Sequence, residues 1–133
     1  MTFRRWLAPL LGCTVLWGCA SGPLQDIGGK ISDVLQPKAE RDLAAGVKSY
    51  EDGDYRPAAK FLQESLDGGL RSAKDQASAH KYLAFIHCVS SRERQCRNEF
   101  RMALDADPAF DLDAAEAGHP IWGPAFRSVK AKK

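Results

Sequence analysis

The residues of this 133-residue sequence with the greatest capacity for chemistry are its four cysteines: Cys13, Cys19, Cys88 and Cys96. In an oxidising compartment such thiols pair as disulfides, whereas in a reducing one they more often hold a metal or act as nucleophiles. The cysteines can therefore be interpreted only once the compartment is known. The N-terminal segment is the part of the chain that bears on it.

The N-terminal segment 1–18 has the layout of an export signal. Arg4 and Arg5 precede the apolar run WLAPLLGCTVLW at 6–17, which is too short to cross a bilayer as a permanent helix. We expect 1–18 to be cleaved; an ordinary signal peptide or a packed N-terminal helix are the alternatives. Removing both arginines lowers the 19 basic residues to 17, equal to the 17 acidic ones. This neutrality argues against a nucleic-acid-binding protein.

The apolar run ends in Leu16-Trp17-Gly18-Cys19, which resembles the lipobox of bacterial lipoproteins. The resemblance implies that Cys19 is lipidated and becomes the N-terminus. Each buried methylene contributes about 0.8 kcal/mol, so two or three acyl chains anchor a small domain firmly. In lipoproteins of double-membrane bacteria, an aspartate directly after the lipidated cysteine favours retention in the inner membrane. That position is Ala20 here, so the resemblance implies that the protein is anchored in the outer membrane of the cell envelope and faces the periplasm.

Residues 19–38 are predicted to be the lipidated cysteine and a flexible linker rich in Gly, Ser and Pro. Within the linker, Leu24, Ile27, Ile31 and Val34 recur at helical spacing. A short amphipathic turn that docks on the domain or on lipid is therefore the alternative to a plain spacer.

Residues 39–131 are dominated by alanine, leucine and charge without strand-like alternation, which predicts an all-α domain. Two segments, about 39–70 and 77–108, align with each other at one constant offset. The alignment places Gly46 over Ala84, Tyr50 over Cys88, Gly53 over Ser91, Ala58 over Cys96, Leu62 over Phe100 and Leu66 over Leu104. Small residues thus match small ones, and most large apolar residues match large apolar ones.

This pattern resembles the tetratricopeptide repeat (TPR), in which small residues lie where two antiparallel helices approach most closely. The resemblance implies two TPR-like helical hairpins; two generic hairpins are the alternative. The offset here is longer than the usual repeat period, so the four-residue excess should lie in the loop at 67–72. Two repeats leave apolar ends, and we expect a C-terminal cap at 109–131. There Asp113 should cap a short turn ending at Gly118, and Pro124 should lie in the first turn of a final helix through about Lys130.

Residues 39–131 resemble the TssQ family of type VI secretion-associated lipoproteins. The resemblance includes the segment His80-Lys81-Tyr82-Leu83-Ala84-Phe85 and the string at 118–124. The most specific residues are Gly118, His119, Pro120, Trp122, Gly123 and Pro124. The resemblance implies an accessory protein of a contractile secretion machine that binds protein partners of its membrane complex. It implies no enzyme activity, cofactor or small-molecule substrate. Alternatives are a general outer-membrane or pilus assembly lipoprotein, or a metal-dependent or cell-wall-modifying enzyme.

If Cys13 leaves with the signal and Cys19 is acylated, Cys88 and Cys96 are the remaining thiols. They flank a predicted hairpin turn, so their α-carbons can come within the roughly 4.4 to 6.8 Å that a disulfide needs. We expect this disulfide; two buried thiols are the alternative. A zinc site with His80 and His87 is disfavoured, because no close cysteine pair completes a tetrahedral set. His119, between glycine and proline, is interpreted as a turn residue and not as a catalytic base.

The partner-binding residues are expected on the first helix of each pair, which lines the groove of such repeats. The candidates are Leu43, Val47, Glu51, Lys81 and Phe85. Several basic residues follow the second turn: Arg92, Arg94, Arg97 and Arg101. We interpret these arginines as a solvated helix face, with a patch that steers towards an acidic partner as the alternative.

Overall fold

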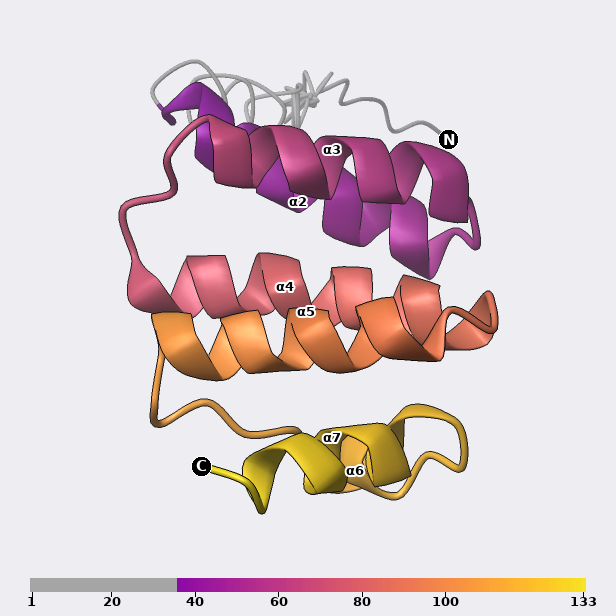
Figure 1. The fold of residues 1–133 in the computed structure, drawn as a ribbon. Coiled ribbons are helices and arrows are strands. Elements are labelled where there is room, and N and C mark those ends of the chain that lie inside the picture. The colour runs from indigo at the N-terminus through magenta and orange to yellow at the C-terminus, as the bar shows by residue number, and fades with distance from the viewer. Residues whose placement is uncertain (1–35) are drawn as a thin grey trace, which may run out of the picture.

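The computed structural model describes residues 36–133 as helices stacked in three layers (Figure 1). The first two layers are the hairpins α2 (Lys38–Glu51) with α3 (Tyr55–Asp67) and α4 (Ala73–Val89) with α5 (Glu93–Ala106). The third contains α6 (Ala114–Ala117) and α7 (Trp122–Lys130). No strand occurs in this part of the chain, so the predicted all-α class is confirmed. The expected signal, Cys19 and the linker up to residue 35 lie outside the described residues.

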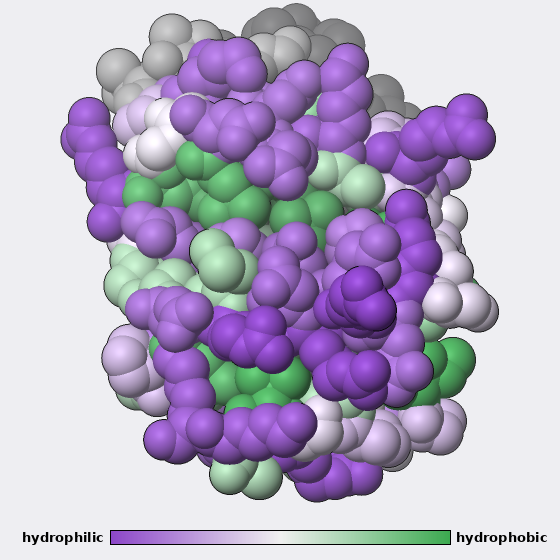
Figure 2. Space-filling view, viewed as in Figure 1, coloured by the Kyte–Doolittle hydropathy of each residue, from purple (hydrophilic) through white to green (hydrophobic). Residues whose placement is uncertain are grey.

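α4 occupies the middle layer because it is apolar on two faces. One face contributes Ala84, Phe85 and Cys88 to a core shared with α5 and α7. The other contributes Leu83 and Ile86, among others, to a core shared with α2 and α3. A helix that is apolar nearly all round has to be buried on both sides. Figure 2 agrees: apolar surface is seen in bands between the layers, with hydrophilic side chains over the helices.

The two hairpin turns repeat each other at the offset that the sequence alignment predicts. The N–H of Gly53 donates to the Tyr50 carbonyl at 3.0 Å, and the N–H of Ser91 donates to the Cys88 carbonyl at 3.1 Å. Both Gly53 (φ 83°) and Ser91 (φ 59°) adopt the left-handed conformation. The neighbouring bonds repeat as well: Asp52 to Lys48 with Ser90 to Ile86, and Asp54 to Ser49 with Arg92 to His87. The sequence alignment therefore holds for the backbone of both turns.

Small residues permit the close approach of α2 and α3. A Cβ placed on Gly46 would lie 2.7 Å from Cγ of Leu62, too close for two carbon atoms. Leu62 is fully buried, as is its counterpart Phe100 in the second hairpin. Fully burying such a side chain contributes roughly 1.5 to 3 kcal/mol. The glycine thus lets α2 lie directly on a large core residue.

α4 begins at Ala73, earlier than the expected start of the second repeat at 77. Its N-cap is Ser72, whose hydroxyl accepts a hydrogen bond from the N–H of Asp75 at 3.3 Å. By the sequence alignment the first residue of α2 corresponds to residue 76, so α4 is longer than α2 by nearly one turn at its N-terminus. Most of the four-residue excess is therefore helical and does not lie in the loop at 68–72, contrary to expectation. This loop is anchored because Leu70 is buried and its carbonyl accepts from Nε2 of Gln76 at 2.7 Å.

The C-terminal segment covers the open side of the second hairpin. Phe126 of α7 packs edge-on against Phe100 of α5, with ring centroids 5.2 Å apart. Asp113 and Glu116 form a capping box at the start of α6, which ends at Gly118. The apolar face of α5 is therefore removed from water by α7.

We predict opposite effects from exchanging the two turn residues. A non-glycine residue in the left-handed region costs roughly 1 kcal/mol, so Ser91→Gly should stabilise the protein by up to about 1 kcal/mol. Gly53→Ser should destabilise it by about the same amount. Urea denaturation of each variant measures both free energies of unfolding. Ser90→Gly is the matched control, because Ser90 has an ordinary φ of −91°. An equal gain from the control would contradict the conformational explanation.

Candidate functional site

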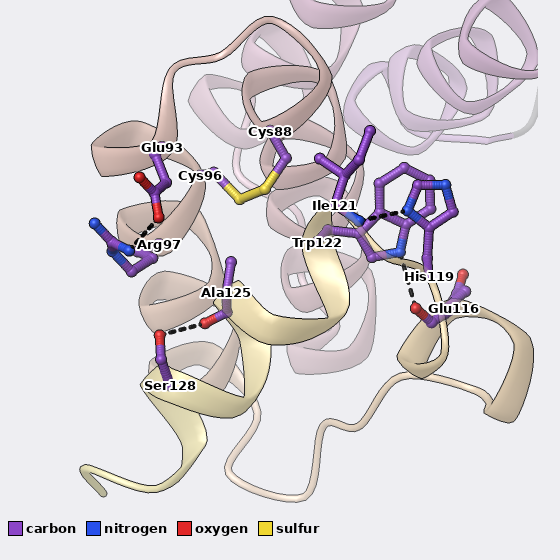
Figure 3. The surroundings of a disulfide bond; sticks show 10 residues. All are labelled: Cys88, Glu93, Cys96, Arg97, Glu116, His119, Ile121, Trp122, Ala125 and Ser128. Atoms are coloured by element: carbon purple, nitrogen blue, oxygen red, sulfur yellow. Dashed lines mark hydrogen bonds and ion pairs between the residues drawn. A yellow bond between two sulfur atoms is a disulfide. The ribbon is translucent and has the colours of Figure 1, made fainter.

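A disulfide joins Cys88 near the end of α4 to Cys96 in α5 across the second turn (Figure 3). The two α-carbons lie 5.1 Å apart. In the first hairpin the equivalent positions, Tyr50 and Ala58, make no covalent link. A loop of this length is expected to stabilise the folded state by about 2 to 3 kcal/mol. The bond closes the turn that contains Ser91, and both cysteines belong to the core against which Trp122 of α7 packs.

Residues of the string at 118–124 build the corner between α6 and α7 (Figure 3). The ring of His119 stacks on Trp122 with centroids 3.3 Å apart, and its Nδ1 accepts from the N–H of Ile121 at 3.2 Å. The indole Nε1 of Trp122 donates to the carbonyl of Glu116 at 3.0 Å. His119 is thus a turn residue in the structure, held by stacking and by a backbone hydrogen bond.

Gly123 is where the two short helices approach most closely. A Cβ on Gly123 would lie 2.4 Å from the carbonyl oxygen of Ala117. That oxygen also accepts from Nη1 of Arg127 at 2.9 Å. Pro120 and Pro124 are exposed at the outside of the corner. The motif therefore has an evident structural task, which is to fold α7 back onto α5.

Aromatic rings link all three layers on the side formed by α2 and α4, the first helices of the two hairpins. Phe85 of α4 stacks on Trp122 with centroids 4.3 Å apart and tilts against Tyr50 of α2 at 6.1 Å. Tyr82 meets Tyr50 edge-on at 5.0 Å. Burial is the largest cause that raises the pKa of Tyr50 to about 12, and Tyr55, Tyr82 and Glu116 add to it. Tyr50 therefore remains neutral at physiological pH.

Lys81 spans the boundary between the second and third layers. Its Nζ pairs with Oε1 of Glu116 at 2.5 Å and lies 4.6 Å from the centroid of the Tyr82 ring. Both side chains of this pair are mostly buried, at 17% and 20% exposure. The charge of Lys81 is therefore already paired within the domain, and its contact with a partner stays a prediction.

Phe85, also expected on the partner-binding surface, is instead a core residue. Only 2% of it is exposed, because it fills the space between Tyr50, Phe100 and Trp122. The spacing in the sequence places Phe85 on the same helix as Lys81. It does not show that neighbouring helices cover α4 on both faces. This expectation is corrected by the structure.

Leu43, Val47 and Glu51, the three expected contacts on α2, line one open hollow of about 480 Å³. Leu43 and Val47 pack inwards against the core around Leu62 and are only partly buried. Glu40 and Asp75 line the same hollow, together with Gln36, Ala44 and Lys48. We call this surface the α2 groove. Glu40 and Asp75 were missed from the sequence, although the spacing of Glu40, Leu43, Val47 and Glu51 places all four on one stripe of α2.

The histidines of α4 face different surroundings. Nδ1 of His80 lies 2.7 Å from Oε2 of Glu99, which ties α4 to α5. The pKa of His87 is lowered, first by burial and then by the charge of Arg92, and Glu99 partly opposes this. Among residues 36–133, no three His, Cys, Asp or Glu side chains are grouped closely enough to hold a metal ion.

The arginines at the start of α5 lie on its exposed side. Arg97 pairs with Glu93 at 2.6 Å, and Nη1 of Arg101 donates to the side-chain oxygen of Asn98 at 3.2 Å. Arg92 and Arg94 are exposed as well. Exposed pairs of this kind contribute little to stability, as for an ordinary solvated face.

Comparison of the chain with models of protein families, with curated protein sequences and with solved structures finds no significant match in any of the three. Within the part of the chain that the structure describes, no helix has the length and apolar character needed to cross a membrane.

We predict that the corner depends on a glycine at 123. Gly123→Ala should destabilise the domain by about 1 to 3 kcal/mol, because the added methyl group would overlap a backbone oxygen. Gly118→Ala is the control, since a Cβ there would lie 3.4 Å from the nearest atom at an ordinary φ of −79°. Urea midpoints of both variants give the difference. Equal destabilisation by the two alanines would contradict the close-packing argument.

Proposed function

We propose that this chain is a lipid-anchored periplasmic scaffold with a TPR-like domain, and that it acts by holding a partner protein in the α2 groove. The observation that carries the proposal is the groove side of α2, where Leu43 and Val47 pack against the core around Leu62 and yet remain partly exposed. α7 covers the α5 side of the stack, but no helix of residues 36–133 covers this one. An apolar stripe left beside a groove is the type of surface that binds a helix or an extended segment.

The repeat geometry supports the TPR-like assignment. The two hairpins share their turn hydrogen bonds at the same offset as the sequence alignment. Gly46, where α2 lies directly on Leu62, corresponds to the fully buried Ala84 of α4. In such stacks the first helices form the binding face, and α2 is the first helix of the first pair. We further propose an accessory role in a type VI secretion system, which rests on the resemblance of the motif at 118–124 and of the lipobox at 16–19.

Cross-linking from the α2 groove tests the binding role. A photoreactive residue at position 44, which lines the groove between Leu43 and Val47, should recover an envelope protein of the secretion machine. Adding Leu43→Asp and Val47→Asp should lower the yield at least tenfold, since apolar contacts at an interface centre carry much of its energy. Met102→Asp is the control, because Met102 is 43% exposed on α5.

The outcome of this cross-linking separates the proposals. Equal loss in the Met102→Asp control would contradict a binding site on α2. Recovery of a pilus or outer-membrane assembly protein would retain the scaffold role but would overturn the secretion assignment.

The lipid anchor has its own test. Cys19→Ser removes the only thiol that the lipobox resemblance marks for acylation, so we expect the protein to leave the membrane fraction. Fractionation of cell envelopes followed by immunoblotting measures this. Since two or three acyl chains hold a domain of this size essentially permanently, the shift should be nearly complete. Unchanged membrane association of the serine variant would contradict the anchor.

A further inference from the structure

The α2 groove combines an apolar floor with an acidic rim. We call its apolar lining residues, Leu43 and Val47, the floor, and its acidic lining residues, Glu40, Glu51 and Asp75, the rim. Within residues 36–133, none of these three carboxylates forms an ion pair with a basic side chain. No basic side chain of the described domain therefore neutralises these carboxylates by direct contact.

Lys48, the basic residue that lines the groove, is already engaged, and so is Lys38 at the start of α2. Nζ of Lys48 donates to Oδ2 of Asp52 at 2.7 Å, and this hydrogen bond is the largest cause that raises the pKa of Lys48. Glu51 is near enough to raise that pKa further, but only through space. Lys38 is bound to Asp42 in the same way. Neither lysine is free to serve the rim carboxylates.

Glu40 adds an observation of a different kind. Its Oε2 is buried and has no hydrogen-bond donor within the described residues. A buried carboxylate oxygen is stable only when it receives a hydrogen bond, so this oxygen is short of one partner. A lysine or arginine that entered the groove would supply both the missing donor and the compensating charge.

We propose that the α2 groove takes a basic amphipathic helix of a partner protein, which lays apolar side chains on Leu43 and Val47 and places a lysine or arginine beside Glu40. This rests on the proposed function of the groove and names the chemistry of its partner. A helix is favoured because Glu40, Leu43, Val47 and Glu51 follow one stripe along α2, which matches the straight seam of a second helix. An anionic membrane surface is disfavoured, because the rim would repel it.

Two synthetic helical peptides of equal length test the charge class: one in which leucines at helical spacing alternate with lysines, and one in which glutamates replace the lysines. Binding to the full-length protein in non-ionic detergent is measured by fluorescence anisotropy, with empty micelles as background. We expect the leucine–lysine peptide to bind and to weaken at higher salt. The leucine–glutamate peptide should bind at least tenfold more weakly. Equal binding of both peptides would overturn the proposal.

Matched variants locate the binding. Glu40→Gln with Glu51→Gln and Asp75→Asn should weaken the leucine–lysine peptide at least tenfold. Glu93→Gln with Asp105→Asn and Asp111→Asn removes the same charge from other exposed pairs, and should change affinity less than twofold. An effect of the same size from both sets would overturn the proposal. Glu51→Lys with Asp75→Lys should reverse the preference towards the leucine–glutamate peptide, a gain that misfolding cannot produce.

Cross-linking from position 44 separates this inference from the proposed function. If the rim variant still cross-links its partner as well as the parent protein does, the groove binds a partner but the basic-helix inference is wrong. If the parent protein gives no cross-link while the peptides still discriminate between the variants, the charge preference stands and the scaffold role fails.

Discussion

α4 has to bury apolar side chains on opposite faces, and most of the architecture follows from that requirement. Phe85 and Ala84 point towards the core shared with α5 and α7, while Leu83 and Ile86 point towards α2 and α3. A single helical hairpin covers only one of these faces. The chain therefore needs a hairpin before α4 and a capping helix after α5, and the three layers of the domain satisfy this need.

A domain of this size has little stability to lose, so its few covalent and close-packed constraints matter. The disulfide holds the second turn, where Ser91 adopts a conformation that glycine supplies in the first. Gly123 brings α7 against the carbonyl of Ala117, which lets Phe126 reach Phe100. The two features lie on adjoining parts of the molecule and both secure the capped end.

The opposite end is built differently. α2 buries its inner side on Leu62 through Gly46, but Leu43 and Val47 remain partly exposed beneath an acidic rim. Within residues 36–133, α7 covers the second hairpin, whereas the α2 groove beside α4 stays open. The proposed partner helix would occupy this groove, so that the apolar stripe that completes the core also forms the binding surface.

The sequence by itself determined the helices, the hairpin offset and the two turns, because these depend on local spacing, on glycine and on capping residues. It also brought Cys88 and Cys96 to one turn, since their separation along the chain is short. Which helix faces become buried was decided only by tertiary packing. Phe85 and Lys81 share a helix, yet the neighbouring layers turn the first into core and pair the second with Glu116. Glu40 and Asp75 meet at one groove only because α2 and α4 lie side by side, a contact between distant residues that no local pattern encodes.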